Sequence, residues 1–423
     1  MEIKIAFYIA VENLNNLDYS TILKGNPGIG GTEYEFLLVP YLLEKRDNGI
    51  TPFLLSRSKQ HFPHKNVQYV NSLKDACEFC VAKQISTIII NQGQFDQNIL
   101  EPYKENLSFI LWAHNNISYP KLSLLSKLNY VKRIVCCGRE MQDLYRDHIA
   151  TFKSTYVYNI FPTKEKEWYL NKMTSQKDNH NVVYMGCLAP QKSFHVLARA
   201  WKDVLKKVPD AQLYVIGSGQ LYNKTEVGKY GLAEENYENY FMSYLKDKNG
   251  ELLSNVHFMG LMGIEKFEIL SRCKVAVPNP TGLTECLPIT AIEMQLMGCT
   301  IVTIKHPAYL DTVYNSQFLY TRTSQLADNI VKALLFGQKD SYDNTYQFIT
   351  TKFGIEDNIQ RWEEIIKNPD LCKLEKYSEK SYQMKPLKDF LLHLKKRFPF
   401  LNSLQPVERF YNFYRIRILK CYQ

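Results

Sequence analysis

A loop, a helix and a strand follow one another in Thr284-Glu285-Cys286-Leu287-Pro288-Ile289-Thr290-Ala291-Ile292-Glu293-Met294-Gln295-Leu296-Met297-Gly298-Cys299-Thr300-Ile301-Val302. Pro288 stands where the first turn of a helix tolerates proline, and Gly298 is placed to end that helix before a strand predicted at residues 300–304. An apolar run at residues 274–277 precedes the loop and predicts another strand. Strand, loop, helix and strand make one crossover unit, which is the building block of a parallel α/β sheet.

The same alternation continues on both sides of a polar linker at residues 174–180. Short runs rich in Ile and Val are typical of buried parallel strands, so the pattern predicts two doubly wound α/β domains. Before the linker we predict a helix at residues 34–43 and strands at residues 4–10, 51–55, 67–70, 86–91, 107–113, 133–137 and 155–158. After it we predict strands near residues 182–186, 212–216, 256–259, 274–277, 300–304 and 318–320, and helices near residues 194–205, 288–297 and 324–335.

Length and composition fit two domains. The chain has 423 residues, of which 45% are hydrophobic and 22% charged, as in ordinary globular proteins. No apolar run approaches the roughly 20 residues that span a bilayer, and the N-terminus alternates like a strand rather than a signal peptide. The ten cysteines are scattered, and Cys77 and Cys80 have no second pair with which to hold zinc. We therefore expect a cytoplasmic protein with reduced thiols.

The two glutamates of the opening stretch have two alternative roles, one in ligand binding and catalysis and the other purely structural. Free backbone N–H groups at the helix start, around Leu287, Pro288 and Ile289, form a site for an anionic diphosphate. A nearby carboxylate can accept hydrogen bonds from sugar hydroxyls, and an unmatched buried acceptor costs about 1 to 3 kcal/mol. The structural alternative makes Glu285 a capping residue and Glu293 a glutamate on the helix surface.

The E-x7-E spacing, the small helix ending at Gly298 and the strand after it resemble the donor-binding signature of glycosyltransferase family 4. The resemblance covers residues 1–366 and implies the GT-B fold, in which two Rossmann-like domains face each other across a cleft. It implies a nucleotide-sugar donor, with UDP-sugar favoured by family habit. Glu293 would hold the ribose hydroxyls and Glu285 would face the donor sugar, while the diphosphate would lie at the helix start.

A second match lies in Tyr184-Met185-Gly186-Cys187-Leu188-Ala189-Pro190-Gln191-Lys192-Ser193-Phe194. The family has a strand, G-R-L, a proline and K-G here, so Lys192 resembles the lysine that contacts the diphosphate. Without the family, Lys192 would be a solvated lysine at a helix start. Cys187 stands where the family has arginine, which removes one phosphate-binding cation. Gly217 and Gly263 lie in glycine-containing turns that resemble those beside the nucleotide, although each could be only a tight turn.

The first domain contributes a glycine loop and a histidine. Gly28-Ile29-Gly30-Gly31-Thr32-Glu33 precedes a predicted helix, and glycines let a backbone approach a phosphate closely. Gly30 and Gly31 resemble the family's first glycine loop, which faces the distal phosphate. His114 follows a predicted strand, where crevice residues of open α/β sheets are found, although a histidine there more often packs or caps. The resemblance implies that His114 meets the donor sugar. Arg139 and Glu140 follow another strand, and we assign them no role.

The mechanism expected from these residues needs no metal. The chain has no Asp-x-Asp motif, so the sequence does not support a metal that bridges the diphosphate. Lys192 and helix N–H groups would instead meet the charge of the departing diphosphate. The resemblance implies retention of anomeric configuration, with the acceptor attacking from the leaving-group side and the diphosphate taking its proton. His114 and Glu285 are the catalytic candidates, with Glu285 positioning the sugar, and we expect no cofactor beyond the nucleotide-sugar co-substrate.

The predicted organisation ends in a basic tail. We expect an acceptor-side domain at residues 1–165, a nucleotide-sugar domain at 166–350, closing helices at 351–370 and the tail at 371–423. The net charge is +9, and the tail has twelve Lys or Arg against four Asp or Glu. Between residues 387 and 420, cations alternate with aromatic and leucine side chains, which favours an anionic membrane surface. A helical pair packed on its own domain, or on a second subunit, fits the same pattern.

Three functions fit the whole sequence. The first is a retaining, metal-independent glycosyltransferase of the hexosyltransferase type, with a glycan, glycolipid or lipid-linked acceptor, working in polysaccharide biosynthesis and peripheral on the inner face of a membrane. The second is a nucleotide-sugar epimerase of GT-B fold, which needs no acceptor. The third is a non-catalytic GT-B scaffold recruited through the basic tail, and the replacement at Cys187 favours it. We expect no nucleic-acid partner, because no base-stacking module accompanies the basic tail.

Overall fold

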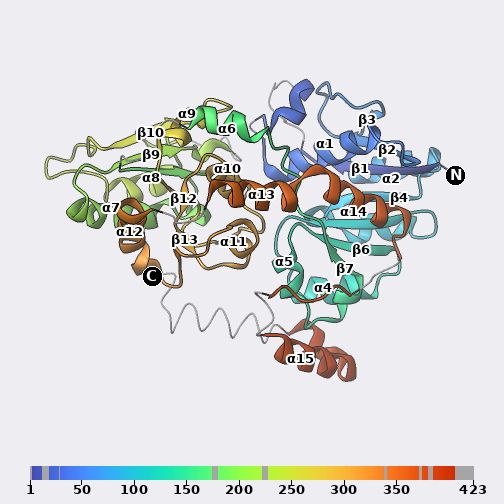
Figure 1. Cartoon of the computed structure of the whole chain (residues 1–423). Coiled ribbons are helices and arrows are strands. Elements are labelled where there is room, and N and C mark those ends of the chain that lie inside the picture. Colours follow the sequence, from blue (N-terminus) through green and yellow to red (C-terminus); the bar gives the residue numbers. More distant parts are fainter. Residues whose placement is uncertain are drawn as a thin grey trace. The chain divides into compact units, whose positions relative to one another are not determined.

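The computed structural model describes residues 2–11, 19–27, 29–173, 180–221, 227–337, 341–370, 374–379 and 384–404. The described chain divides into two compact units (Figure 1). Unit 1 contains the residues up to Pro162 together with those from Lys352 to Leu404, and unit 2 contains Thr163–Thr351. The predicted linker lies outside the described residues, except for His180.

Unit 1 is built on a seven-stranded sheet with the strand order β3-β2-β1-β4-β5-β6-β7. Every neighbouring pair is parallel. Strands β1, β2 and β3 follow one another from the middle of the sheet to one side, and the chain then returns to β4 on the other side of β1. Residues that follow β1 and β4 therefore meet at the same edge of the sheet. All seven strands predicted before the linker are confirmed: β1 (Ile3–Ile9), β2 (Ile50–Ser56), β3 (Val67–Tyr69), β4 (Thr87–Asn91), β5 (Ser108–Ala113), β6 (Val131–Cys136) and β7 (Ser154–Tyr156).

The core of unit 1 forms between this sheet and two helices distant in sequence, α1 and α14, which lie side by side in Figure 1. Trp362 of α14 is fully buried and packs on Trp112 of β5, with ring centroids 4.6 Å apart. Arg46, just after α1, pairs with Glu363 at 2.9 Å. The helices are α1 (Gly31–Glu44), α2 (Leu73–Ala82), α3 (Gln97–Leu100), α4 (Tyr119–Lys127), α5 (Arg139–Leu144), α14 (Ile355–Lys367) and α15 (Lys385–Arg397).

Unit 2 repeats the same strand order in a five-stranded sheet, β10-β9-β8-β11-β12, and adds a two-stranded sheet, β13-β14. The single strand predicted at residues 300–304 is wrong, because β12 pairs with β11 and β13 pairs with β14. The chain changes partner at Val302, after which the Thr303 hydroxyl donates to the carbonyl oxygen of Asn279 at 2.9 Å. The strands are β8 (Asn181–Met185), β9 (Gln212–Ile216), β10 (Val256–Gly260), β11 (Val275–Val277), β12 (Thr300–Ile301), β13 (Thr303–Ile304) and β14 (Leu319–Tyr320).

The helices of unit 2 follow from apolar stripes in the sequence. On α7, the buried residues Phe194, Leu197, Trp201 and Val204 recur at helical spacing. All the helices predicted in this part of the chain are confirmed. They belong to the set α6 (Lys166–Lys172), α7 (Phe194–Lys207), α8 (Glu235–Met242), α9 (Lys266–Arg272), α10 (Ile289–Leu296), α11 (Pro307–Thr312), α12 (Leu326–Phe336) and α13 (Tyr342–Phe353).

The described part of the C-terminal tail packs on unit 1. Arg139 donates to the carbonyl oxygens of Lys376 and Tyr377 at 2.9 and 3.0 Å, and Glu140 accepts a hydrogen bond from the Ser378 hydroxyl. The two residues to which the sequence assigned no role therefore hold this segment. Packing of the tail on its own domain is one of the arrangements that the sequence predicts, and it holds as far as residue 404. The rest of the basic tail lies outside the described residues.

Among the described residues, no helix is long and apolar enough to cross a bilayer, and no three His, Cys, Asp or Glu side chains gather as metal ligands would. The cysteines in the described ranges are buried. Burial raises the pKa of Cys77 and of Cys80 to about 12, so both remain neutral thiols inside α2.

Candidate functional site

Glu285 ends a tightly folded loop that follows β11. Thr284 adopts a φ of 61°, a left-handed backbone that disfavours a β-branched residue. Gly282 has a φ of 68°, and a Cβ there would lie 2.7 Å from Cγ of His306. Position 282 therefore requires glycine, and the loop is held in one conformation that fixes the start of the Glu285 side chain.

Glu285 pairs with Lys192, which lies in the turn between β8 and α7. The Lys192 Nζ is 2.7 Å from the Glu285 Oε1, and the side chains are 21% and 11% exposed. Both side chains are therefore half-buried. The structure thus brings together two residues, far apart in sequence, that the sequence assigned to the same diphosphate and sugar.

The turn that carries Lys192 departs from the K-G pattern at the next residue. Ser193 has a φ of 57°, a conformation in which glycine is usual. Its hydroxyl lies 2.7 Å from the hydroxyl of Thr281, in the loop after β11. Tyr184 of β8 also donates to the carbonyl oxygen of Lys192 at 3.1 Å. The serine therefore links the two loops that carry Lys192 and Glu285, at the cost of a strained backbone.

Asn279 is the centre of this arrangement, and the sequence analysis missed it. Its side-chain amide donates to the carbonyl oxygens of Leu283 and Gln191 at 2.7 and 3.1 Å and lies 3.2 Å from the Glu285 carboxylate. Its Oδ1 accepts from the Thr281 N–H and hydroxyl, both at 3.1 Å. One buried amide therefore joins the Lys192 turn to the Glu285 loop. The available signal was an asparagine shortly after a buried strand.

Helix α10 starts just beyond Glu285 with its first turn uncapped by a side chain. Pro288 is the N-cap residue and makes no side-chain cap bond. Leu287 and Pro288 are buried, whereas Ile289 is half-buried. The N-terminal N–H groups of such a helix favour an anion, because the helix dipole adds to their own hydrogen-bonding capacity. The predicted diphosphate position is therefore next to the loop that holds Glu285.

Glu293 is a buried, paired carboxylate. It is 6% exposed, which rules out the alternative of a surface glutamate. Lys266, at the start of α9, places its Nζ 2.6 Å from Glu293 Oε1. Burial, together with the nearby charge of Glu293, raises the pKa of Tyr169 to about 12. Lys266 is a second residue that the sequence analysis missed, because its turn offered no spacing that connects it to α10.

Cys187 contributes no charge to the site. Its side chain is 3% exposed, and burial raises its pKa to about 11, although the charge of Lys192 opposes the shift. Gly217 has a packing role, since a Cβ there would lie 1.9 Å from the carbonyl oxygen of Gly186. At Gly263 a Cβ would approach only the end of the Glu265 side chain, at 3.1 Å, so packing alone does not demand glycine at that position.

In unit 1, the glycine loop leads into α1. Gly30 is the N-cap residue, accepts a hydrogen bond from the Tyr34 N–H at 3.0 Å and leaves the helix start without a side-chain cap. The side chain of Asn26 braces the loop through two hydrogen bonds to the backbone of Ile29, at 2.8 and 2.9 Å. Gly31 is the first helical residue, and Gly28 lies outside the described residues.

His114 follows β5 among aromatic rings. Its ring centroid is 4.7 Å from that of Trp112 and 6.1 Å from that of Phe36, and both ring nitrogens are buried without a hydrogen-bond partner. Burial lowers the pKa of His114 to about 3, with Asn159 opposing the shift, so the imidazole is neutral. Glu35 lies in the same part of the core and accepts a hydrogen bond from the Ile160 N–H at 3.0 Å. His114 therefore packs but does not cap, and its ring keeps unused hydrogen-bonding capacity.

Comparison with known proteins connects unit 2 to one family. Residues 179–335 match the family model described as glycosyl transferases group 1. That range contains Lys192, Glu285, Glu293 and the start of α10, all of which the geometry above places in one unit.

Two curated relatives point the same way. The chain is 22% identical over 306 residues to an uncharacterized glycosyltransferase of Haemophilus influenzae, covering 70% of this chain and 81% of that protein. It is 28% identical over 216 residues to an uncharacterized glycosyltransferase of Methanocaldococcus jannaschii, covering 47% of this chain and 48% of that protein.

Solved structures share the fold at low sequence identity. Anabaena HepE in complex with UDP and glucose has a TM-score of 0.60 and 17% identity, covering 87% of this chain and all (100%) of that one. Sucrose-phosphate synthase from Thermosynechococcus elongatus has a TM-score of 0.62 and 13% identity, covering 87% of this chain and 99% of that one. The two doubly wound sheets are therefore those of a GT-B protein.

Proposed function

Because this chain is a GT-B glycosyltransferase with a group 1 domain at residues 179–335, we propose that it transfers a hexosyl group from a UDP-sugar with retention of configuration and without a metal. The observation that carries the proposal is the half-buried Lys192–Glu285 pair, 2.7 Å long, beside the uncapped start of α10. A cation, a carboxylate and free N–H groups are the chemistry that a sugar diphosphate requires.

The donor would bind to unit 2 through three parts. The diphosphate takes the backbone N–H groups of Leu287 and Ile289, on either side of Pro288, which has no N–H of its own, together with the ammonium of Lys192. The ribose hydroxyls donate to Glu293, whose carboxylate is already oriented by Lys266. Gly217 and Gly263 keep the surrounding turns small enough for the nucleotide.

Transfer would proceed at the carbon that bears the diphosphate. As the bond to the diphosphate oxygen breaks, its growing negative charge is met by Lys192 and by α10, which is why no metal is needed in this proposal. The acceptor hydroxyl attacks from the side of the leaving group and gives its proton to a diphosphate oxygen, which retains configuration. Glu285 holds the donor sugar through its hydroxyls.

Binding of the donor would break the Lys192–Glu285 ion pair but would leave the other contacts of Glu285 in place. Lys192 can turn from Glu285 to the diphosphate, because the two groups are partly exposed and face each other at 2.7 Å without full burial. Glu285 keeps the hydrogen bond from Asn279 when this happens. After the exchange, Lys192 contacts the diphosphate of the donor and Glu285 contacts its sugar.

In unit 1, we assign His114 to the donor sugar and the Gly30–Gly31 loop to the distal phosphate. A neutral imidazole with both nitrogens unsatisfied can donate to and accept from sugar hydroxyls without the cost of burying a charge. The acceptor in this proposal is a glycan, glycolipid or lipid-linked sugar of polysaccharide biosynthesis. The enzyme would work in the cytoplasm, peripheral to the inner face of a membrane.

The proposal is tested by following donor consumption and product stereochemistry. UDP-sugars are incubated with the enzyme, with and without EDTA, and the anomeric proton of the product is read by NMR. We expect a retained anomer in both conditions. Lys192→Met should lower kcat about 100-fold, as the loss of one preorganised charge-stabilising group does. An inverted product, or activity abolished by EDTA, would contradict the mechanism.

One observation favours a second candidate, a non-catalytic scaffold. Cys187 is a buried neutral thiol where the family pattern has a phosphate-binding arginine. A scaffold would show neither donor hydrolysis nor transfer with any nucleotide-sugar, whereas a low-affinity enzyme would show turnover that saturates at high donor concentration. Restoring the cation in Cys187→Arg should tighten donor binding only if the site is used.

A further inference from the structure

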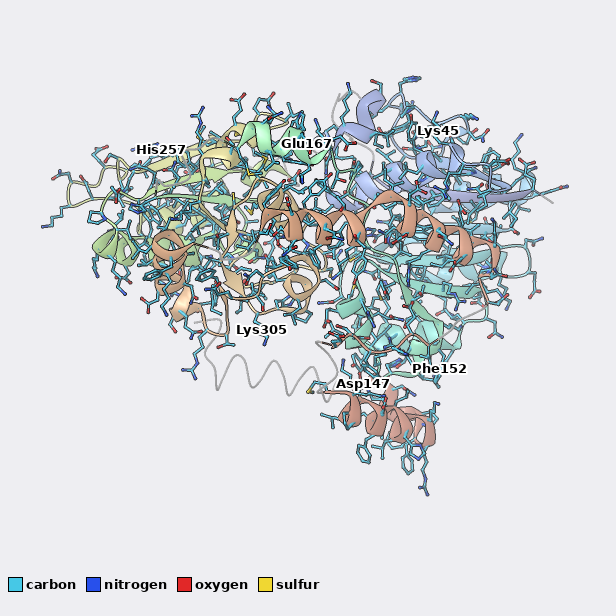
Figure 2. All side chains as sticks on the ribbon, viewed as in Figure 1. Lys45, Asp147, Phe152, Glu167, His257 and Lys305 are labelled. Atoms are coloured by element: carbon cyan, nitrogen blue, oxygen red, sulfur yellow. The ribbon has the colours of Figure 1, made fainter. Side chains whose placement is uncertain are left out.

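Helix α15 turns its charged side toward the protein. The Lys395 Nζ pairs with Asp147 Oδ2 at 2.7 Å, and the two side chains are 2% and 0% exposed. Lys388, on the same face two helical turns earlier, is also buried and donates to the carbonyl oxygen of Asp143. Figure 2 shows Asp147 and Phe152 on the side of unit 1 that α15 covers.

These contacts fix the rotation of the helix about its axis. Tyr119 of α4 donates to the second oxygen of Asp147 at 2.5 Å, and the Lys395 ammonium lies 4.4 Å from the centre of the Tyr119 ring. A buried ion pair with these supporting contacts cannot be rotated outward without leaving a charge unpaired in the interior. Leu391, Leu392 and Leu394 of the same helix are half-buried, so α15 packs by two buried lysines together with part of its apolar surface, whereas surface helices usually pack by an apolar stripe alone.

The other apolar side chains of α15 remain exposed. Leu387 and Phe390, one turn apart, are 44% and 60% exposed. Phe398 and Phe400, in the turn that follows the helix, are 40% and 75% exposed. We call this surface the α15 face, and it also includes two exposed cations: Leu387, Phe390, Lys396, Arg397, Phe398 and Phe400.

We infer that the α15 face docks on an anionic phospholipid bilayer. Aromatic and leucine side chains that project beside exposed cations suit the boundary between headgroups and acyl chains, where the apolar groups insert and the cations meet the lipid phosphates. The charge of the whole tail has the matching sign, since residues 371–423 have twelve Lys or Arg against four Asp or Glu. The acidic member of the helix, Asp389, is bonded to the Tyr377 hydroxyl at 2.9 Å.

This inference deepens the proposed function, because a lipid-linked acceptor would be presented at the surface on which the enzyme docks. Membrane docking rests on the proposed function only for its biological purpose. Docking itself needs neither donor nor acceptor, so it is measured without them, and its failure leaves the transfer reaction untouched.

The experiment is vesicle flotation with the full chain. Vesicles contain phosphatidylcholine alone or phosphatidylcholine mixed with phosphatidylserine. We expect the wild type to float with the mixed vesicles only, and Phe390→Ser/Phe400→Ser to lose at least about tenfold in affinity. The matched control is Phe336→Ser at the end of α12, because Phe336 is 76% exposed and lies in unit 2. The control should float like the wild type.

A second variant separates charge from insertion. Lys396→Glu/Arg397→Glu should weaken flotation and remove most of its dependence on salt. All variants should keep wild-type affinity for nucleotide diphosphates, which shows that they are folded. Equal flotation of the double phenylalanine variant and the wild type would overturn the inference. It would also be overturned if the wild type ignored both vesicles and formed a dimer that the same variant dissociates, because the α15 face would then be a protein interface.

Discussion

Replacing Asn279 by alanine should disconnect the two loops of the proposed donor site. Asn279 is 4% exposed and holds the carbonyl oxygens of Gln191 and Leu283, which belong to the Lys192 turn and the Glu285 loop. Its Oδ1 accepts two further hydrogen bonds from Thr281. Alanine removes all of these hydrogen bonds.

The magnitude follows from those contacts. At about 1 kcal/mol for each neutral hydrogen bond, Asn279→Ala should lower the free energy of unfolding by about 3 kcal/mol. The effect on catalysis should be larger than on donor binding. Displacing a positioned group by about 1 Å can cost about 100-fold, so kcat should fall between about 10-fold and 100-fold.

The assay compares urea unfolding and steady-state kinetics with a matched control. Asn329→Ala is that control, since Asn329 makes one exposed hydrogen bond, to the Gln325 carbonyl oxygen at 2.8 Å. The control should change stability by less than about 0.5 kcal/mol. Asn279→Asp adds a second test, because the new carboxyl would be buried and would lie close to Glu285.

The aspartate variant should depend on pH in a defined direction. Burial and the like charge of Glu285 would raise the pKa of the new carboxyl above its unfolded value of about 3.9, so the folded state would bind the extra proton. Stability of Asn279→Asp relative to Asn279→Ala should therefore fall as the pH rises above about 4. The reasoning is refuted if Asn279→Ala unfolds within about 0.5 kcal/mol of the wild type and keeps its kcat.

Three further predictions concern stability. Lys395→Met should lower the free energy of unfolding in urea by about 3 to 5 kcal/mol, because it leaves Asp147 buried without a cation. The control Lys396→Met, at an exposed neighbouring position, should change that free energy by almost nothing. Equal effects of the two substitutions would refute the burial argument. Thr284→Gly should raise the free energy of unfolding by up to about 1 kcal/mol by relieving a φ of 61°, and a lower thermal midpoint would contradict this. Burial raises the pKa of Glu35 well above its ordinary value of 4.5, so the stability of the wild type falls as the pH rises above that value. The stability advantage of Glu35→Gln over the wild type should therefore be larger at about pH 8 than at about pH 5. A difference that stays constant with pH would argue against a buried acid.

The sheets were predictable because their signal is local. Runs of Ile and Val such as those in β1 and β4 predict buried strands wherever they occur, and the alternation with helices predicts the parallel order. The division of residues 300–304 into β12 and β13 was not predictable, because it depends on which strand each half meets. A run of Thr, Ile and Val has the same sequence pattern whether the strand stays in one sheet or passes into a second sheet.

The sequence indicated residues of the proposed donor site only where a family pattern connects distant positions. Glu285, Glu293 and Lys192 were proposed in this way, but Asn279 and Lys266 were not. Their importance arises from contacts to loops from another part of the chain, and sequence spacing contains no record of such contacts. The C-terminal tail shows the same limit, since its periodicity predicts an amphipathic helix but does not say which face packs. On α15, two lysines are buried beside the half-buried leucines, which the periodicity did not indicate.

The most direct test of the central claim is a calorimetric titration of uridine, guanosine and adenosine diphosphates into the wild type and into Glu293→Ala. The predicted result is selective binding of uridine diphosphate to the wild type, with affinity reduced at least about tenfold in Glu293→Ala, because two ribose hydroxyls lose their acceptor. Absence of binding by all three nucleotides, or equal binding to both proteins, would contradict the assignment of this site to a nucleotide-sugar donor.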